Sequence, residues 1–214
     1  FTDGLVSDAL GSEAEFLWID LEHCAMSPEA LAGHLMACRL RGVPSLVRTP
    51  SHLTPFVKAA LDAGADGVIV PQITCAGEAR QVVSDCRYPP LGRRGYGPRV
   101  PSDYGRDGGD EYVARANREI FASVQIENAE ALRDVDEICR VEHLDSVVIG
   151  PYDLSASLGV MGQLRHPLVL EGIERVVEAA RKRGLFVGAG MGCDPDYAAL
   201  LAGMGVNWLQ IGND

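Results

Sequence analysis

The 214-residue sequence predicts an α/β fold of the TIM (β/α)8-barrel type. Two observations predict it. Short apolar segments alternate with helical segments along the chain, and polar side chains follow the apolar segments where these end. Seven strands are expected, so the first strand and the last helix of an eightfold barrel are expected to lie outside this chain. A doubly wound sheet is the alternative, but it would gather its polar residues at one switch point.

Each expected strand is a short run of apolar residues, many of them β-branched or aromatic. Continuous runs of this kind are typical of strands that are buried on both faces of a parallel sheet. The seven runs are Phe16–Ile19, Ser45–Val47, Gly67–Val70, Phe121–Ile126, Ser146–Ile149, Leu185–Val187 and Trp208–Ile211.

The segments between these runs have helical patterns. Ser27 followed by Pro28 is a typical helix start, with an N-cap residue before a proline in the first turn. The expected helices are 1–10, 28–41, 54–63, 76–86, one from 110, 128–139, one opening at 153–156, 167–183 and 195–202. The stretch 87–109 is rich in Pro, Gly and Arg, and a loop of that length in a compact domain usually has a function.

Length and composition indicate a single domain, residues 1–214, with one sizeable core. The net charge of −11 argues against nucleic acid or an anionic membrane as a partner. No apolar run approaches the roughly 20 residues that a membrane helix needs. The six cysteines form no CxxC pair, which is typical of a reducing compartment and predicts a cytoplasmic protein.

Two carboxylates follow consecutive expected strands. Glu127 ends the run 121–126, and Asp153 opens the helix after the run 146–149. In a barrel these two strand ends are neighbours, so the side chains are expected to lie close together. Two hard oxygen ligands suit Mg²⁺ or Mn²⁺ better than zinc. The simpler alternative is that Asp153 only caps its helix.

Several stretches, taken together and in order, resemble the HpcH/HpaI aldolase family, which contains metal-dependent class II aldolases of 2-oxo acids. The stretches that carry the resemblance are IDLEH (19–23), VR (47–48), LDAG (61–64), GVIVP (67–71), RYPP (87–90), RG (94–95), VQIE (124–127) and IGPYDLS (149–155). They span almost the whole chain.

The resemblance implies a (β/α)8 barrel that makes or breaks a C–C bond between the enolate of pyruvate, or of a similar 2-oxo acid, and an aldehyde. It implies Glu127 and Asp153 as ligands of Mg²⁺, Mn²⁺ or Co²⁺, and Arg48 on the substrate oxygen. It also implies acid–base work by His23 with Asp20.

Further roles follow from the same resemblance. Asp62 is a candidate partner for a histidine across a subunit contact, although helix capping is its simpler role. Substrate-binding candidates are Arg48, Gln72, Gln125, Tyr152 and Asp153. Tyr152 and Gln72 stand where many family members have Ala and Met, and both bear on which substrate is used. Family members commonly form hexamers, as trimers of dimers, that exchange a C-terminal helix.

Other functions fit less well. A related acyl-CoA lyase or a phosphoenolpyruvate-utilising barrel is the second enzyme class, and a non-enzymatic scaffold is the third hypothesis. The Arg-rich loop contains neither a P-loop nor a GxGxxG at a strand–helix joint, which argues against nucleotide binding. Schiff-base chemistry is disfavoured because Lys58 and Lys182, the only lysines, fall within expected helices.

Overall fold

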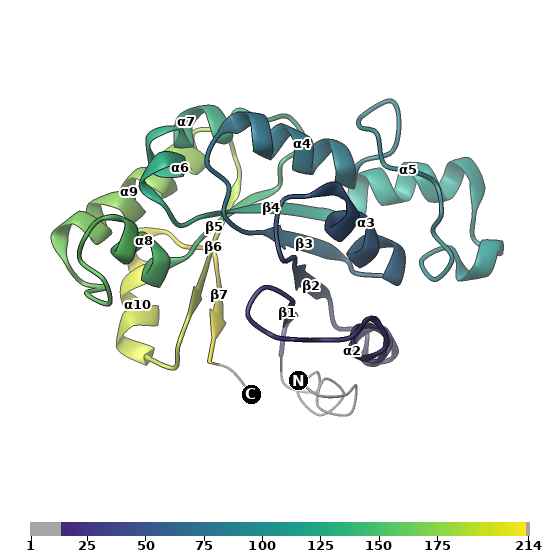
Figure 1. Ribbon diagram of the computed structural model, residues 1–214, viewed down its shortest axis with the longest axis horizontal. Helices are drawn as coiled ribbons and strands as arrows, with labels where there is room; N and C mark the ends of the chain where they lie inside the picture. The colour runs from purple at the N-terminus through teal and green to yellow at the C-terminus, as the bar shows by residue number, and fades with distance from the viewer. Residues whose placement is uncertain (1–13, 213–214) are drawn as a thin grey trace. The chain divides into compact units, whose positions relative to one another are not determined.

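The computed structural model describes residues 14–212, so the helix expected over residues 1–10 lies outside the described part of the chain. All seven expected strands are present in this part, and they follow one another in chain order within a sheet (Figure 1). Every pairing that is resolved is parallel. The strands are β1 (Leu17–Asp20), β2 (Ser45–Arg48), β3 (Gly67–Val70), β4 (Phe121–Ile126), β5 (Ser146–Ile149), β6 (Phe186–Met191) and β7 (Trp208–Ile211).

Helices connect the strands, as the alternating pattern predicts. They are α2 (Pro28–Arg41), α3 (Thr54–Ala63), α4 (Ala76–Cys86), α5 (Gly109–Glu119), α6 (Ala129–Arg133), α7 (Val135–Ile138), α8 (Pro151–Ser157), α9 (Pro167–Arg181) and α10 (Pro195–Met204). The Ser27 hydroxyl accepts a hydrogen bond from the N–H of Ala30, which confirms the predicted cap of α2. The loop 87–109 contains one short 3-10 turn, η1 (Asp103–Gly105).

The described chain folds into two compact units. The first unit comprises residues 14–70 and 81–122, and the second comprises residues 71–80 and 123–212. The single domain expected over residues 1–214 stays a prediction.

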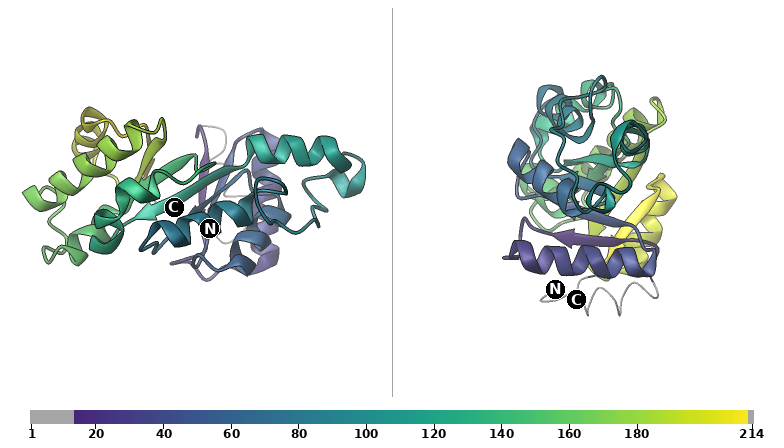
Figure 2. Two further views of the ribbon diagram at one scale, coloured as in Figure 1. Left: turned by 90° about the horizontal axis from the view of Figure 1, so that it is seen from above. Right: turned by 90° about the vertical axis from the view of Figure 1, so that its right-hand side faces the viewer.

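In the first unit, β1, β2 and β3 pair side by side, and α2 packs against β1 and α3 (Figure 2). All four residues of β3 are buried, as the apolar run predicts. The start of β4 comes so close to β3 that a Cβ atom on Gly67 would lie 2.5 Å from the carbonyl oxygen of Phe121. Only glycine fits there.

In the second unit, β4 to β7 form a parallel set, and α9 packs against β5 and β6. The β5 residues Val147, Val148 and Ile149 are fully buried, and so are Ile173 and Val176 on α9. This core fixes the positions of the carboxyl ends of β4 and β5, where the candidate metal ligands lie.

Several expected boundaries are wrong, and three of them illustrate why. The helix expected over 128–139 is two short helices, α6 and α7, that meet at Asp134, whose carboxylate accepts a hydrogen bond from the N–H of Ala76. The strand β6 extends to Met191 rather than ending at Val187, and α9 ends at Arg181 rather than Arg183.

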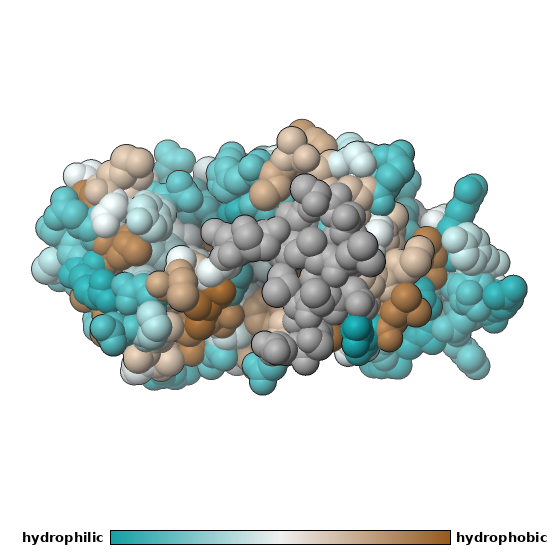
Figure 3. Space-filling view, turned by 90° about the horizontal axis from the view of Figure 1, so that it is seen from below, coloured by the Kyte–Doolittle hydropathy of each residue, from teal (hydrophilic) through white to brown (hydrophobic). Residues whose placement is uncertain are grey.

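The surface mixes polar and apolar side chains, as the face in Figure 3 illustrates. Within the first unit, the large exposed apolar side chains include Met36, Leu40, Tyr96 and Tyr104. None of the helices between residues 14 and 212 combines the length and apolar character needed to cross a membrane. None of the six cysteines, all of which lie within residues 14–212, forms a disulfide, as their spacing predicts.

Candidate active site

In the first unit, the ends of β1 and β2 bring Asp20 and Arg48 together. They are register partners on the paired strands. The Arg48 guanidinium donates from Nε to Asp20 Oδ1 (2.8 Å) and from Nη2 to Oδ2 (2.6 Å). It also lies over the ring of Trp18, 5.3 Å from the centroid. The guanidinium plane is therefore held from two sides.

The Asp20 carboxylate also shapes the turn after β1. Its Oδ1 accepts from the backbone N–H of Glu22 (2.9 Å) and of His23 (3.4 Å), which is an Asx-type turn. Burial alone would raise the pKa of Asp20. The hydrogen bonds and charge of Arg48, together with these two N–H groups, outweigh burial and hold the pKa below its usual value.

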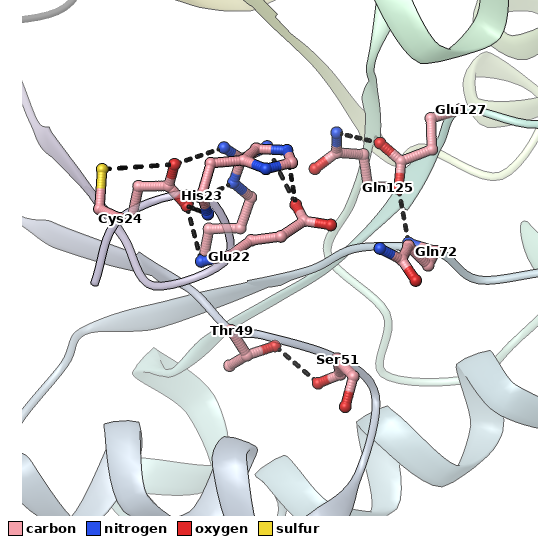
Figure 4. A network of polar contacts seen from close by, with 10 residues as sticks. Glu22, His23, Cys24, Thr49, Ser51, Gln72, Gln125 and Glu127 are labelled. Atoms are coloured by element: carbon pink, nitrogen blue, oxygen red, sulfur yellow. Dashed lines mark hydrogen bonds and ion pairs between the residues drawn. The ribbon is translucent and has the colours of Figure 1, made fainter. Parts of the chain in front are cut away.

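Glu22 is a site residue to which sequence reasoning gave no role. Its side chain is 7% exposed, and Oε2 lies 3.2 Å from Arg48 Nη1 and 3.7 Å from His23 Nε2 (Figure 4). The only signal in the sequence is its place inside the turn that Asp20 organises. Glu22 thus places a carboxylate beside the imidazole, whereas both oxygens of Asp20 accept hydrogen bonds from Arg48. The His23 side chain is 64% exposed and open to solvent.

In the second unit, Glu127 directly follows β4 and is buried, with 6% of the residue exposed. A hydrogen bond reaches each of its two oxygens (Figure 4). The backbone N–H of Gln72 donates to Oε1 at 2.6 Å, and Nε2 of Gln125 donates to Oε2 at 2.5 Å. Gln72, which donates the backbone bond, has a left-handed backbone conformation with φ of +58°.

The predicted neighbourhood of Glu127 and Asp153 rests on the register of β4 and β5. Ile126 is paired with Ile149, and the next N–H, that of Gly150, donates to the carbonyl of Ile126. Asp153 follows in the first turn of α8 and is exposed. Gly150 holds the N-cap position of α8, so the alternative interpretation of Asp153 as the cap is wrong.

The side chains at this corner fit a hard divalent cation. Both are carboxylates, and the hydrogen bonds on the two oxygens of Glu127 fix the orientation of the group, as is usual around a metal ligand. A Cβ atom on Gly150 would lie 2.9 Å from Glu127 Oε2, so glycine leaves the carboxylate its space. Among residues 14–212, no group of three or more His, Cys, Asp or Glu is placed to hold a metal. Two protein ligands would leave positions for water and substrate.

Asp62 and Tyr152 lie in settings that the sequence did not indicate. The Asp62 carboxylate accepts from Nη2 of Arg94 at 3.0 Å, and the Arg94 side chain is only 1% exposed. Asp62 is therefore an ion-pair partner of a buried arginine, and the C-cap position of α3 is held by Gly64. The Tyr152 side chain is 59% exposed, and its carbonyl accepts from the Ser155 hydroxyl at 2.6 Å.

Known proteins resemble this chain over its whole length. A 2-keto-3-deoxy-L-rhamnonate aldolase of Salmonella dublin is 36% identical over 215 aligned residues, which cover 100% of this chain and 79% of that protein. The crystal structure of an HpcH/HpaI aldolase from Desulfitobacterium hafniense DCB-2 matches with a TM-score of 0.93 at 32% identity, over 99% of this chain and 82% of that one.

A family protein of the HpcH/HpaI aldolase/citrate lyase type from Burkholderia cenocepacia J2315 matches with a TM-score of 0.89 at 31% identity, covering 98% of this chain and 84% of that one. These likenesses confirm the α/β-barrel fold class, and the doubly wound alternative is set aside. The family model for HpcH/HpaI aldolase/citrate lyase matches residues 2–214. The chain therefore belongs to the HpcH/HpaI aldolase/citrate lyase family and is an aldolase, a carbon–carbon lyase.

Proposed function

We propose that this aldolase cleaves a 2-keto-3-deoxy sugar acid to pyruvate and an aldehyde, with Mg²⁺, Mn²⁺ or Co²⁺ held by Glu127 and Asp153. The observation that carries the proposal is the buried Glu127 carboxylate, which has a hydrogen bond on each oxygen and stands at the strand end next to the one that Asp153 follows. The sugar-acid class is supported by the 36% identity to a 2-keto-3-deoxy-L-rhamnonate aldolase.

Family aldolases generally depend on a divalent metal. When bound, the cation would supply Lewis-acid polarisation of the 2-oxo group. The choice among the three metals belongs to the proposal, since two carboxylate ligands suit all of them.

The protein's own residues move the proton. In cleavage, His23 takes the proton of the C4 hydroxyl while the C3–C4 bond breaks, and the C4 oxygen becomes the aldehyde carbonyl. The electron pair of the broken bond moves toward the 2-oxo group. His23 then delivers its proton to C3, directly or through water, which completes pyruvate and frees the imidazole for the next cycle. Glu22 lies beside this proton carrier, with Oε2 3.7 Å from His23 Nε2.

The other candidate residues are proposed to bind the substrate and orient it. Arg48 contacts the substrate oxygen through its positively charged guanidinium group. Asp20 holds the edge of that group and Trp18 covers its face. The Gln72 and Tyr152 side chains are exposed and contact the part of the substrate that varies between relatives. Asp62 serves a histidine of a second subunit, and a cytoplasmic homo-hexamer is the proposed assembly. The acyl-CoA lyase alternative is not favoured by any contact described above.

The test is release of pyruvate from 2-keto-3-deoxy-L-rhamnonate and from a panel of related 2-keto-3-deoxy acids, with Mg²⁺, Mn²⁺ or Co²⁺ added. We expect Glu127→Ala and Asp153→Ala each to lose Mn²⁺ binding in calorimetry while they keep the wild-type circular dichroism. Near-normal Mn²⁺ affinity in both variants would overturn the metal site. Wild-type protein that releases no pyruvate from any member of the panel would overturn the substrate class.

A further inference from the structure

Gln125 has a hydrogen-bonding pattern that a residue serving only the fold would not need. It lies on β4, is 3% exposed, and is two residues before Glu127, so both side chains lie on the same face of the strand. Its Nε2 donates to Glu127 Oε2 at 2.5 Å. A carboxylate oxygen can only accept, which fixes the orientation of the amide. Its Oε1 is buried and has no hydrogen-bond partner among the described residues.

The bond between Gln125 and Glu127 completes the support of the carboxylate. The Gln72 N–H holds Oε1 from the backbone, and the Gln125 amide holds Oε2 from a side chain. The backbone at Gly150 closes the same corner, because a Cβ atom there would lie 2.7 Å from Gln125 Nε2 and 2.9 Å from Glu127 Oε2. The pair therefore has little room to rotate.

We propose that Gln125 is a positioning residue. It holds the Glu127 carboxylate in the orientation that a divalent cation requires, and it keeps Oε1 for an O–H donor that enters with the cation or the substrate. This inference rests on the proposed metal site and revises the expectation that Gln125 only binds substrate. A residue next to a ligand typically changes metal affinity or activity by roughly 10- to 100-fold.

The experiment compares Gln125→Met with wild type in two measurements. Methionine has a similar shape but can neither donate to Glu127 nor leave an amide oxygen unpaired. We expect the Mn²⁺ dissociation constant to rise roughly 10- to 100-fold in calorimetry. We expect the urea midpoint of the metal-free protein to fall, because Glu127 Oε2 stays buried and loses its side-chain donor, so the Mn²⁺ affinity is the readout that reports positioning. Gln163→Met, at an exposed glutamine, is the matched control.

The outcomes separate this inference from the metal site itself. If Glu127→Ala binds Mn²⁺ as wild type does, the metal site fails. If Glu127→Ala loses Mn²⁺ while Gln125→Met keeps wild-type affinity, Gln125 has no positioning role. A lower urea midpoint of metal-free Gln125→Met with unchanged Mn²⁺ affinity would show a purely structural residue.

A second Mn²⁺ titration identifies the O–H donor to Gln125 Oε1. It is carried out with pyruvate, which has no hydroxyl, and with a 2-keto-3-deoxy acid. A larger Gln125→Met effect with the hydroxylated acid assigns Oε1 to substrate, and equal effects assign it to water.

Discussion

Arg48 and Asp20 meet side on at the ends of two neighbouring strands, with Nε and Nη2 of the guanidinium each donating to a different carboxylate oxygen. The side chains are 14% and 19% exposed, so the pair is largely removed from water. A pair in this setting affects folding stability as well as the site, because the unfolded chain does not hold Asp20 against Arg48.

The first prediction concerns the pH dependence of that pair. Because the pKa of Asp20 is lowered in the folded protein, its contribution to stability is fully present above the pKa of the unfolded chain, about 3.9. That contribution is lost as pH falls through the lower, folded value. Asp20→Asn should therefore reduce the free energy of unfolding by roughly 1.5–3 kcal/mol at pH 7, the usual range for a hydrogen bond to a charged group.

Urea denaturation of Asp20→Asn and wild type between pH 7 and pH 3 measures this difference. It should stay level down to about pH 5 and shrink below about pH 4. Glu142→Gln, which removes an exposed carboxylate, is the control. A difference between Asp20→Asn and wild type that stays constant to pH 3 would contradict the prediction.

The second prediction separates the two parts of Gln72. Its backbone N–H bonds Glu127, whereas its side chain is exposed and is proposed to contact substrate. Glycine adopts the left-handed conformation at no steric cost, so Gln72→Gly should keep the N–H bond and lose only the side chain. We expect Mn²⁺ affinity within about twofold of wild type and a KM for the sugar acid raised roughly 10-fold, the effect of losing about 1.4 kcal/mol of binding. Loss of Mn²⁺ affinity would show that the side chain itself supports the metal site.

Much of the fold could be predicted from local pattern, and the exceptions have long-range causes. The bounds of β3, β4, β5 and β7 match the apolar runs because β-branched and apolar residues carry the strand signal themselves. The later part of β6, Gly-Ala-Gly followed by Met191, carries little of this signal. It is a strand because Gly188 packs under the Trp208 ring, where a Cβ atom would lie 2.2 Å away.

The candidate site likewise contains residues that the local sequence pattern indicates and residues whose contacts depend on how the chain folds. Glu127 and Asp153 could be predicted because each directly follows a recognisable strand. The contacts of Glu22 could not, since they depend on how the turn after β1 folds back to Arg48. The pairing of Asp62 with Arg94 joins residues 32 positions apart in the sequence, and no spacing rule connects them.

A third prediction concerns assembly. Leu40 on α2 is 79% exposed and Met36 is 62% exposed, although both are large apolar side chains. If a second subunit covers this face, Leu40→Asp should weaken the assembly, because a charge is costly to bury. Light scattering should show a dimer or hexamer for the wild type at micromolar concentration and a smaller species for the variant. A wild-type monomer at that concentration would contradict the proposed assembly.

The last prediction tests the proton transfer assigned to His23. An aldolase that forms the enolate of pyruvate should exchange the C3 protons of pyruvate with solvent in the absence of an aldehyde. His23→Ala should slow this exchange by roughly 10²- to 10⁴-fold, the usual effect of removing a positioned acid–base group. Mn²⁺ affinity should stay at the wild-type value, because His23 is not proposed as a ligand. Proton NMR of pyruvate in D₂O with the metal-loaded protein measures the rate.

His143→Ala is the matched control for this experiment, because it removes another exposed histidine that is not proposed for the site. Exchange by His23→Ala at the wild-type rate would leave the metal site intact and reassign the base.

Glu22→Gln tests the neighbouring carboxylate in the same assay. Because Glu22 Oε2 is the carboxylate oxygen found beside the imidazole, its neutralisation should slow exchange by less than loss of the imidazole does. Equal losses in Glu22→Gln and His23→Ala would show instead that the two residues act as one unit.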